Sequence, residues 1–197
     1  MKKLLVVMLL AVAMVAPVFA TDKGAMEVDV KAGLLIEPII MWEYSGYKWS
    51  YPAETTFSLG ADFYYYVLNN LGIGAGVNHI FQSKMNEDYS SPDAKVGATN
   101  IYLSLKPVLE VGENKFIDKV YFLGQLGYGI FNNEKICWSD FSKEADNGIY
   151  WAIGVGVEKF NVIVELMYSV NYSYFDWWEE SLTYRNIAIN VGYKFTI

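Results

Sequence analysis

The sequence predicts an all-β protein: an eight-stranded antiparallel up-and-down transmembrane β-barrel, preceded by a cleaved signal peptide. Three observations lead to this prediction. Apolar and polar residues alternate one for one in eight stretches, the connections between them are alternately long and short, and no apolar run after the N-terminal one is long enough for a membrane helix. A closed barrel of strands is the other way in which a chain can cross hydrocarbon.

The N-terminal run has the features of an export signal. Two lysines precede a long apolar segment that Pro17 interrupts and that ends in Val18, Phe19 and Ala20, with small or modest residues at the positions that a signal peptidase inspects. A transmembrane helix is the weaker interpretation, because the polar residues of 21–24 follow at once. We therefore expect residues 1–20 to be removed on export and residues 21–197 to form one outer-membrane β-barrel domain.

The eight alternating stretches are each about nine to twelve residues long, which is the length that a tilted strand needs to cross hydrocarbon. The final one is the clearest, because Ile187, Ile189 and Val191 share one face while Asn190 and Lys194 share the other. The fifth is the weakest, because its Leu123 falls on the polar face. The stretches run over about 26–37, 56–67, 71–81, 99–109, 120–130, 149–157, 162–172 and 186–197.

The connections provide an independent test of the prediction. Outer-membrane barrels join their strands by short turns on the periplasmic side and by long loops outside. The short connections here are 68–70, 110–115 and 158–161, and the long ones are 38–55, 82–98, 131–148 and 173–184. This alternation places both termini of the barrel in the periplasm. Aromatic residues make up 17% of the chain, and many lie at strand ends, where a membrane interface favours them.

A soluble eight-stranded barrel is the main structural alternative, since it is also exported and also alternates. Its apolar face would lie inside. In this chain the apolar face is rimmed with aromatic residues, whereas the opposite face carries charges among many glycines. Small residues suit a narrow eight-stranded interior. Together with the loop lengths, this distribution favours the membrane barrel.

The last eight residues resemble the assembly signal of bacterial outer-membrane barrels, through Asn190, Gly192, Phe195 and Ile197. The terminal Ile departs from the more usual Phe. Residues 21–197 resemble the small barrels of the OmpX, opacity-protein and OmpA-barrel group. This resemblance implies a monomer in the outer membrane, with outer-membrane lipid, lipopolysaccharide and the barrel assembly machinery as partners. The group includes adhesins, structural barrels, narrow channels and lipid-modifying enzymes.

Charged residues on the polar face are candidates for a network inside the barrel. Unpaired charges in a narrow interior are costly, so we expect lysines and carboxylates to pair there. The alternative is a gated path for protons or small solutes. Glu27, Glu110 and Glu158 are expected nearer the periplasmic rim. The predicted lumen ion-pair network consists of Asp29, Lys31, Asp62, Lys106, Glu165 and Lys194.

Aromatic residues in the long connections are the best candidates for contact with an extracellular or host ligand. Aromatic side chains anchor binding surfaces, but they also pack loops and line lipid interfaces. Arg185, the only arginine, has outward parity and is a candidate contact for a lipopolysaccharide phosphate. The loop aromatics of interest are Trp42, Tyr47, Trp49, Trp138, Phe175, Trp177 and Trp178.

Composition narrows the function. With 22 acidic against 15 basic residues and a formal net charge of −7, a nucleic-acid partner is disfavoured. Cys137 is the only cysteine, so the chain has no internal disulfide, and His79 has no neighbouring nucleophile. We expect no cofactor, no metal and no catalytic residues. The sequence predicts a structural or adhesin-like barrel that acts through four loops, with a narrow porin-like channel as the alternative and a lipid A-modifying enzyme as the third possibility.

Overall fold

The computed structural model describes residues 22–85, 95–111, 116–133, 136–138, 141–143, 146–175 and 180–197. The predicted signal peptide, residues 1–20, lies outside these ranges. Among the described residues, no helix is long and apolar enough to cross a membrane.

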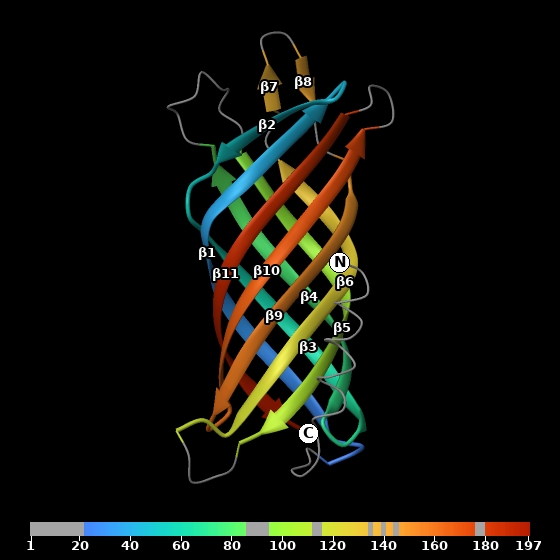
Figure 1. Ribbon diagram of the computed structural model, residues 1–197, viewed down its shortest axis with the longest axis vertical. Coiled ribbons are helices and arrows are strands. Elements are labelled where there is room, and N and C mark those ends of the chain that lie inside the picture. The colour runs from blue at the N-terminus through green and yellow to red at the C-terminus, as the bar shows by residue number, and fades with distance from the viewer. Residues whose placement is uncertain are drawn as a thin grey trace.

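Strands make up nearly all of the described chain (Figure 1). Aromatic and β-branched residues that alternate with polar ones suit the two faces of a pleated strand, and each predicted stretch coincides with one. The strands are β1 (Met26–Tyr44), β2 (Tyr47–Pro52), β3 (Thr56–Leu68), β4 (Leu71–Lys84), β5 (Lys95–Glu110), β6 (Lys119–Asn133), β7 (Ile136–Trp138), β8 (Phe141–Lys143), β9 (Gly148–Lys159), β10 (Val162–Phe175) and β11 (Glu180–Thr196).

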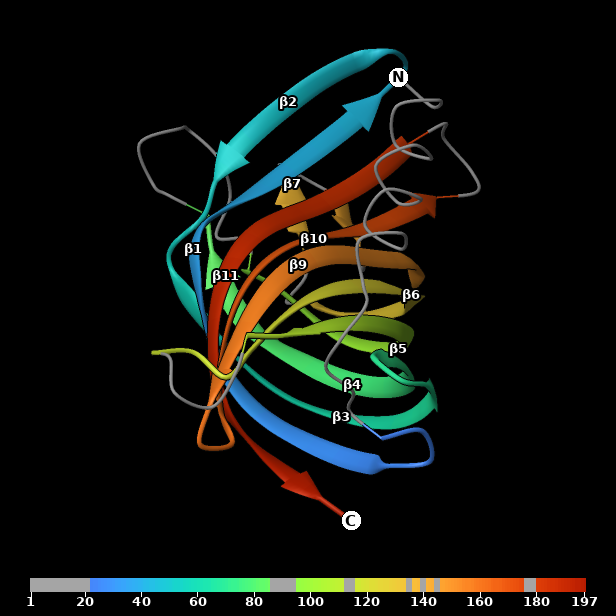
Figure 2. The same ribbon diagram turned by 60° about the horizontal axis from the view of Figure 1, so that its bottom comes forward.

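The main sheet closes on itself, as the curved wall of strands in Figure 2 shows. Its order is β11-β10-β9-β6-β5-β4-β3-β1, and β1 pairs with β11 from Glu27 opposite Thr196 to Tyr44 opposite Glu180. Within the described part of the chain β2 pairs only with β1, so eight antiparallel strands form the wall. Closure leaves no row of unpaired backbone groups facing hydrocarbon. The predicted up-and-down barrel is confirmed.

The two faces of the wall have the predicted polarity. Val30 and Leu103 point outward and are 50% and 69% exposed, whereas their neighbours Lys31 and Ser104 are buried. Leu123, the residue that weakened the prediction for 120–130, does point inward and is buried. A continuous exposed apolar surface is what a lipid-facing wall requires, because hydrocarbon offers polar groups no partners.

The first connection differs from the prediction. Residues 38–55 were expected to form a loop, but β1 continues through Pro38 to Tyr44 and forms a hairpin with β2. The register with β11 shifts between Ile36 and Ile39, so a bulge accommodates the proline, which has no N–H to donate. The hairpin turns at Ser45 and Gly46, whose φ angles of 48° and 83° fit a two-residue turn.

The strand ends fall into two groups. One end, which we call the turn end, contains the start of β1, the end of β11 and the short turns. At this end the Ile197 N–H donates a hydrogen bond to the Met26 carbonyl at 2.9 Å. The turn predicted at 110–115 is longer than expected, because β6 begins only at Lys119. The opposite end, which we call the loop end, carries the β1–β2 hairpin and the long connections. That the turn end faces the periplasm stays a prediction of the loop-length rule.

One carboxylate holds two turns together at the turn end. Lys159 Nζ donates to Asp118 Oδ1 at 2.6 Å, and the N–H of Phe160 donates to Oδ2 at 3.2 Å. These hydrogen bonds, the one from Lys159 first, lower the pKa of the Asp118 carboxyl below its usual range. The connection before β6 is thereby tied to the turn between β9 and β10.

We expect Asp118→Asn to lower the urea midpoint of unfolding at pH 7 but not near pH 2. A lowered pKa in the folded state stabilises the protein above the ordinary carboxyl pKa of about 3.9, and this stabilisation is lost as the pH falls through the lowered value. Midpoints of both proteins in detergent micelles, measured by tryptophan fluorescence across this range, test the expectation. Asp22→Asn, at an exposed position of the same end, is the control. If the urea midpoint of Asp118→Asn is lower than that of the wild type by the same amount at every pH, the expectation is contradicted.

Candidate functional site

Three lysines lie inside the barrel. Lys31 on β1, Lys106 on β5 and Lys194 on β11 occupy inward positions of strands whose other face is apolar, and all three side chains are buried. An isolated buried ammonium group is very costly, so each lysine needs carboxylate partners.

Lys31 joins three strands of the wall. Its Nζ lies 2.6 Å from Asp62 Oδ2 on β3 and 2.9 Å from Glu165 Oε2 on β10. Glu165 also accepts hydrogen bonds from the Tyr121 hydroxyl at 3.1 Å and from Asn190 Nδ2 at 3.2 Å. Both oxygens of this buried carboxylate are therefore satisfied, which is the condition under which a buried ion pair is tolerated.

Lys106 occupies the second centre of charge. Its Nζ contacts Glu27 Oε1 and lies 2.8 Å from Asp29 Oδ2, both on β1. The ammonium group also lies 4.6 Å and 4.5 Å from the ring centroids of Tyr64 and Tyr121. Cation–π contact with two rings replaces part of the hydration that Lys106 loses on burial.

Lys194 extends the network toward the turn end. It contacts Glu158 Oε1 on β9 and lies 3.9 Å from Glu27 Oε2. The structure thus brings together all six residues that the sequence nominated and adds Glu27 and Glu158, which had been expected nearer the rim. The alternation in the sequence showed that Glu27 and Glu158 point inward, but it did not show how close they lie to the lysines of other strands. Glu110 lies outside this group and pairs with Lys119 at 3.2 Å.

The network contains more carboxylates than lysines. Asp29 and Asp62 lie directly opposite each other on β1 and β3, where like charges repel. Among the described residues, Asp29 Oδ1 has no hydrogen-bond donor. Negative charge is therefore in excess inside the barrel, and the lysines hold the network together.

Glycines make room for the tyrosine rings of the interior. A Cβ at Gly156 would overlap the ring of Tyr121, and a Cβ at Gly76 would overlap Asp62 and the ring of Tyr102. The sequence predicts small residues in this interior because an eight-stranded barrel is narrow. The structure gives the specific reason at these two positions, which is that each of the two glycines faces a large inward side chain on a neighbouring strand.

Among the described residues, the middle of the interior has little free space. A cavity of about 20 Å³, lined by Lys31, Leu35 and several amide and hydroxyl groups, has room for a single water molecule. Around it, Tyr150 donates to Gln125 at 2.7 Å and Ser169 donates to Asn186 at 2.9 Å. The middle of the barrel is a packed polar layer.

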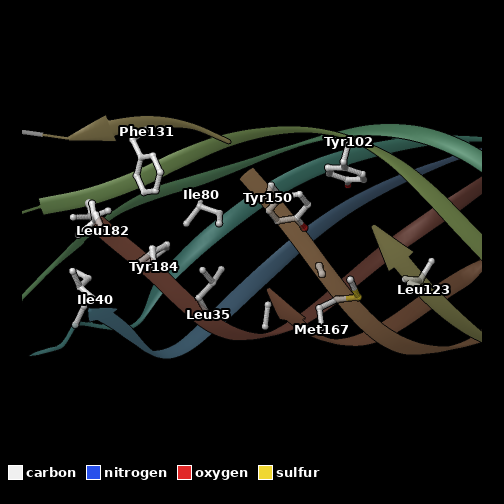
Figure 3. Close-up of a cluster of buried hydrophobic side chains, with 14 of the residues drawn as sticks. Leu35, Ile40, Ile80, Tyr102, Leu123, Phe131, Tyr150, Met167, Leu182 and Tyr184 are labelled. Atoms are coloured by element: carbon white, nitrogen blue, oxygen red, sulfur yellow. The ribbon is translucent and has the colours of Figure 1, made fainter. Parts of the chain in front are cut away.

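Apolar side chains gather in the interior toward the loop end of the strands, and Figure 3 shows this cluster. They come from β1, β4, β6 and β11, point into one space and are all buried. We call this group the apolar cap. It consists of Leu35, Ile40, Ile80, Phe131, Leu182 and Tyr184.

Three of the predicted surface aromatics meet on the β1–β2 hairpin. Trp42 and Trp49 are opposite each other in the two strands, and the rings of Tyr47 and Trp49 stack with centroids 6.1 Å apart. Tyr47 is 69% exposed. Trp138 and Phe175 belong to β7 and β10, but their side chains lie outside the described part, as do Trp177 and Trp178 entirely.

The predicted assembly-signal residues occupy both faces of β11. Phe195 and Ile197 are exposed on the lipid side, where Phe195 packs edge-on against Tyr193 at 5.0 Å. Asn190 points inward and donates to Glu165, so it also belongs to the charge network. Their role in assembly stays a prediction.

His79 lies on the outer wall. Its Nδ1 is 2.9 Å from the Thr99 hydroxyl, and its ring packs edge-on against Phe81 at 4.8 Å. Among the described residues, no group of three or more His, Cys, Asp or Glu is arranged to hold a metal ion. These contacts are consistent with a structural role for His79 in the wall.

Comparison with known proteins agrees with this geometry. A family model described as "Outer membrane protein beta-barrel domain" matches residues 4–195. A search of curated protein sequences finds no match. Among solved structures, the outer membrane protein AlkL in lipid bilayers has a TM-score of 0.50 at 12% identity, covering 92% of this chain and 95% of its own.

Two further solved structures are similar. Neisserial surface protein A has a TM-score of 0.49 at 16% identity, over 87% of this chain and 99% of its own. Ail of Yersinia pestis has a TM-score of 0.47 at 16% identity, over 88% of this chain and 100% of its own.

The charge imbalance predicts an order of stabilities. Lys106→Met is expected to destabilise the barrel by about 3–5 kcal/mol, because it leaves Glu27 and Asp29 buried without their nearest cation. Asp29→Asn is expected to lower the free energy of unfolding by less than Lys106→Met does. Lys106 remains paired with Glu27 in this variant, and Asp62 no longer lies opposite a like charge. Urea titrations of the protein in phospholipid vesicles give the free energies of unfolding.

Lys48→Met is the matched control for this comparison. Lys48 pairs with Glu43 at 3.1 Å on the exposed hairpin, and a solvated pair of this kind contributes less than about 1 kcal/mol. Equal losses for Asp29→Asn and Lys106→Met would show that negative charge is not in excess inside the barrel.

Proposed function

We propose that this chain, which belongs to the outer membrane protein β-barrel domain family, is a non-conducting and non-enzymatic barrel that presents a recognition surface at its loop end. Integral location in the bacterial outer membrane follows from the family and from the lipid-facing wall. The structural and adhesin-like part of the function is the proposal.

The filled interior is the observation that carries the proposal. From the turn end to the loop end it contains the charge network, then a polar layer with room for one water, then the apolar cap. A solute path needs continuous space or weakly bound water, and an eight-stranded barrel has little of either. The small cavity between the described side chains supports the non-conducting barrel over the narrow channel, the alternative drawn from the sequence.

The β1–β2 hairpin supports the recognition role. It continues one strand of the wall, β1, beyond the lipid-facing belt, and in this part β1 pairs with β11 on one side and with β2 on the other. It presents the stacked rings of Tyr47 and Trp49. Exposed aromatic side chains on a rigid support lose little conformational entropy when they bind, which is typical of recognition surfaces.

The wild-type protein is expected to give no unitary current steps in planar lipid bilayers. The physical reason is the cost of moving an ion past buried lysines and then through the apolar cap. Recordings use refolded protein, with an outer-membrane porin in the same bilayers as the positive control. Steps that vanish on neutralising Asp62 or Lys106 contradict the proposal and favour the channel.

Replacing both stacked rings, Tyr47→Ala with Trp49→Ala, is expected to reduce attachment several-fold. The assay counts bacteria of a poorly adherent strain, expressing each variant, that bind to cultured cells or to surfaces coated with extracellular matrix. The control replaces Phe116 and Phe160, two exposed aromatics of the turn end, by Ala. Surface expression of each protein is matched by immunodetection. Attachment that stays at the wild-type value in the hairpin variant contradicts the recognition role.

A further inference from the structure

A groove crosses the outer wall near the loop end. It has a volume of about 540 Å³ and is formed by β1, β2, β9, β10 and β11. Four of these strands, β1, β11, β10 and β9, lie side by side in Figure 1. The groove opens on the outside of the wall and is separate from the barrel interior. Its volume exceeds what a phosphate group needs and lies in the range of small-molecule binding sites.

Arg185 lies in this groove at the height of the outer membrane boundary. Below it, the outward residues of β11 from Ile187 to Ile197 are all apolar or aromatic. At a rise of about 3.4 Å per residue and a tilt of about 40°, this segment spans about 26 Å, which is the height of a barrel's apolar band. The guanidinium group therefore belongs at the level of lipid headgroups.

The groove carries an excess of positive charge in an acidic protein. Lys48 and Arg185 line it together with Glu43, the carboxylate that pairs with Lys48 at 3.1 Å. Within the described part of the chain Arg185 forms no ion pair. The exposed pair between Lys48 and Glu43 is weak, so Lys48 can exchange its partner for a stronger anion. A phosphate is such an anion, and arginine binds it with two parallel hydrogen bonds.

Aromatic side chains form another part of the groove. Trp151 and Tyr168 pack edge to face with centroids 5.7 Å apart, and Tyr172 lies beside them. Rings at the membrane interface offer an apolar surface next to polar groups. Such a surface suits a sugar ring or the first carbons of an acyl chain.

We infer that this groove binds a phosphorylated glycolipid of the outer leaflet. Arg185 donates to the phosphate, Lys48 adds a second positive charge, and Trp151 and Tyr168 pack against the sugar. The combination of an anion-binding arginine with a large aromatic floor favours a phosphorylated sugar over a diacyl phospholipid, whose headgroup is small. The inference goes beyond the proposed recognition role, because its ligand is a lipid of the membrane itself.

Native mass spectrometry of the detergent-solubilised barrel tests this inference. The protein is mixed with equal amounts of bisphosphorylated lipid A, dephosphorylated lipid A and dimyristoyl phosphatidylglycerol, and the retained lipid is counted. Wild type is expected to retain bisphosphorylated lipid A about fivefold over the other two, and Arg185→Gln to lose this preference. Arg185→Lys is expected to keep part of it, because it preserves the charge but not the paired hydrogen bonds.

Lys159→Gln, at the turn end, is the matched control and is expected to bind as wild type does. Strand circular dichroism and heat-dependent gel mobility establish that each variant is folded. Equal retention of all three lipids, or an unchanged preference in Arg185→Gln, overturns the inference. Retention of phosphatidylglycerol as strongly as lipid A overturns the choice of a glycolipid, since phosphate alone would then suffice.

Discussion

Hydrocarbon around a closed wall of eight strands is the constraint on which the rest of this structure depends. Every backbone group of the wall must find its partner within the sheet, so β11 has to pair with β1. Outward side chains must be apolar, which leaves the interior as the one place for charge within the membrane. Three lysines and their carboxylates are there for this reason, and they tie together strands that are distant in sequence.

The same constraint moves function to the outside of the barrel. An interior this narrow is filled by the side chains that the alternation sends into it, and glycines make room for the rings of Tyr102 and Tyr121. In the part of the chain that the structure describes, the hairpin beyond the lipid belt and the groove on the outer wall are exposed to other molecules. Aromatic rings contribute to both, with a cation beside the rings of the groove.

Much of the fold could be predicted because a strand has a strict period of two. The alternation placed Ile189 outside and Lys31 inside correctly, and it placed Leu123 inside even where that weakened the pattern. The continuation of β1 past Pro38 could not be predicted in this way. A bulge shifts the register there, and the compensating pairs come from β2 and β11, which are not visible in the local pattern.

The sequence by itself determined which side chains face lipid and which face the interior, because parity along a strand depends only on neighbouring residues. Only the tertiary structure decided which charges meet. Lys31 pairs with Glu165, 134 residues away, and Lys106 contacts Glu27 rather than a carboxylate of its own strand. These partners depend on the tilt and stagger of all eight strands together, since those set which inward positions share a level across the barrel.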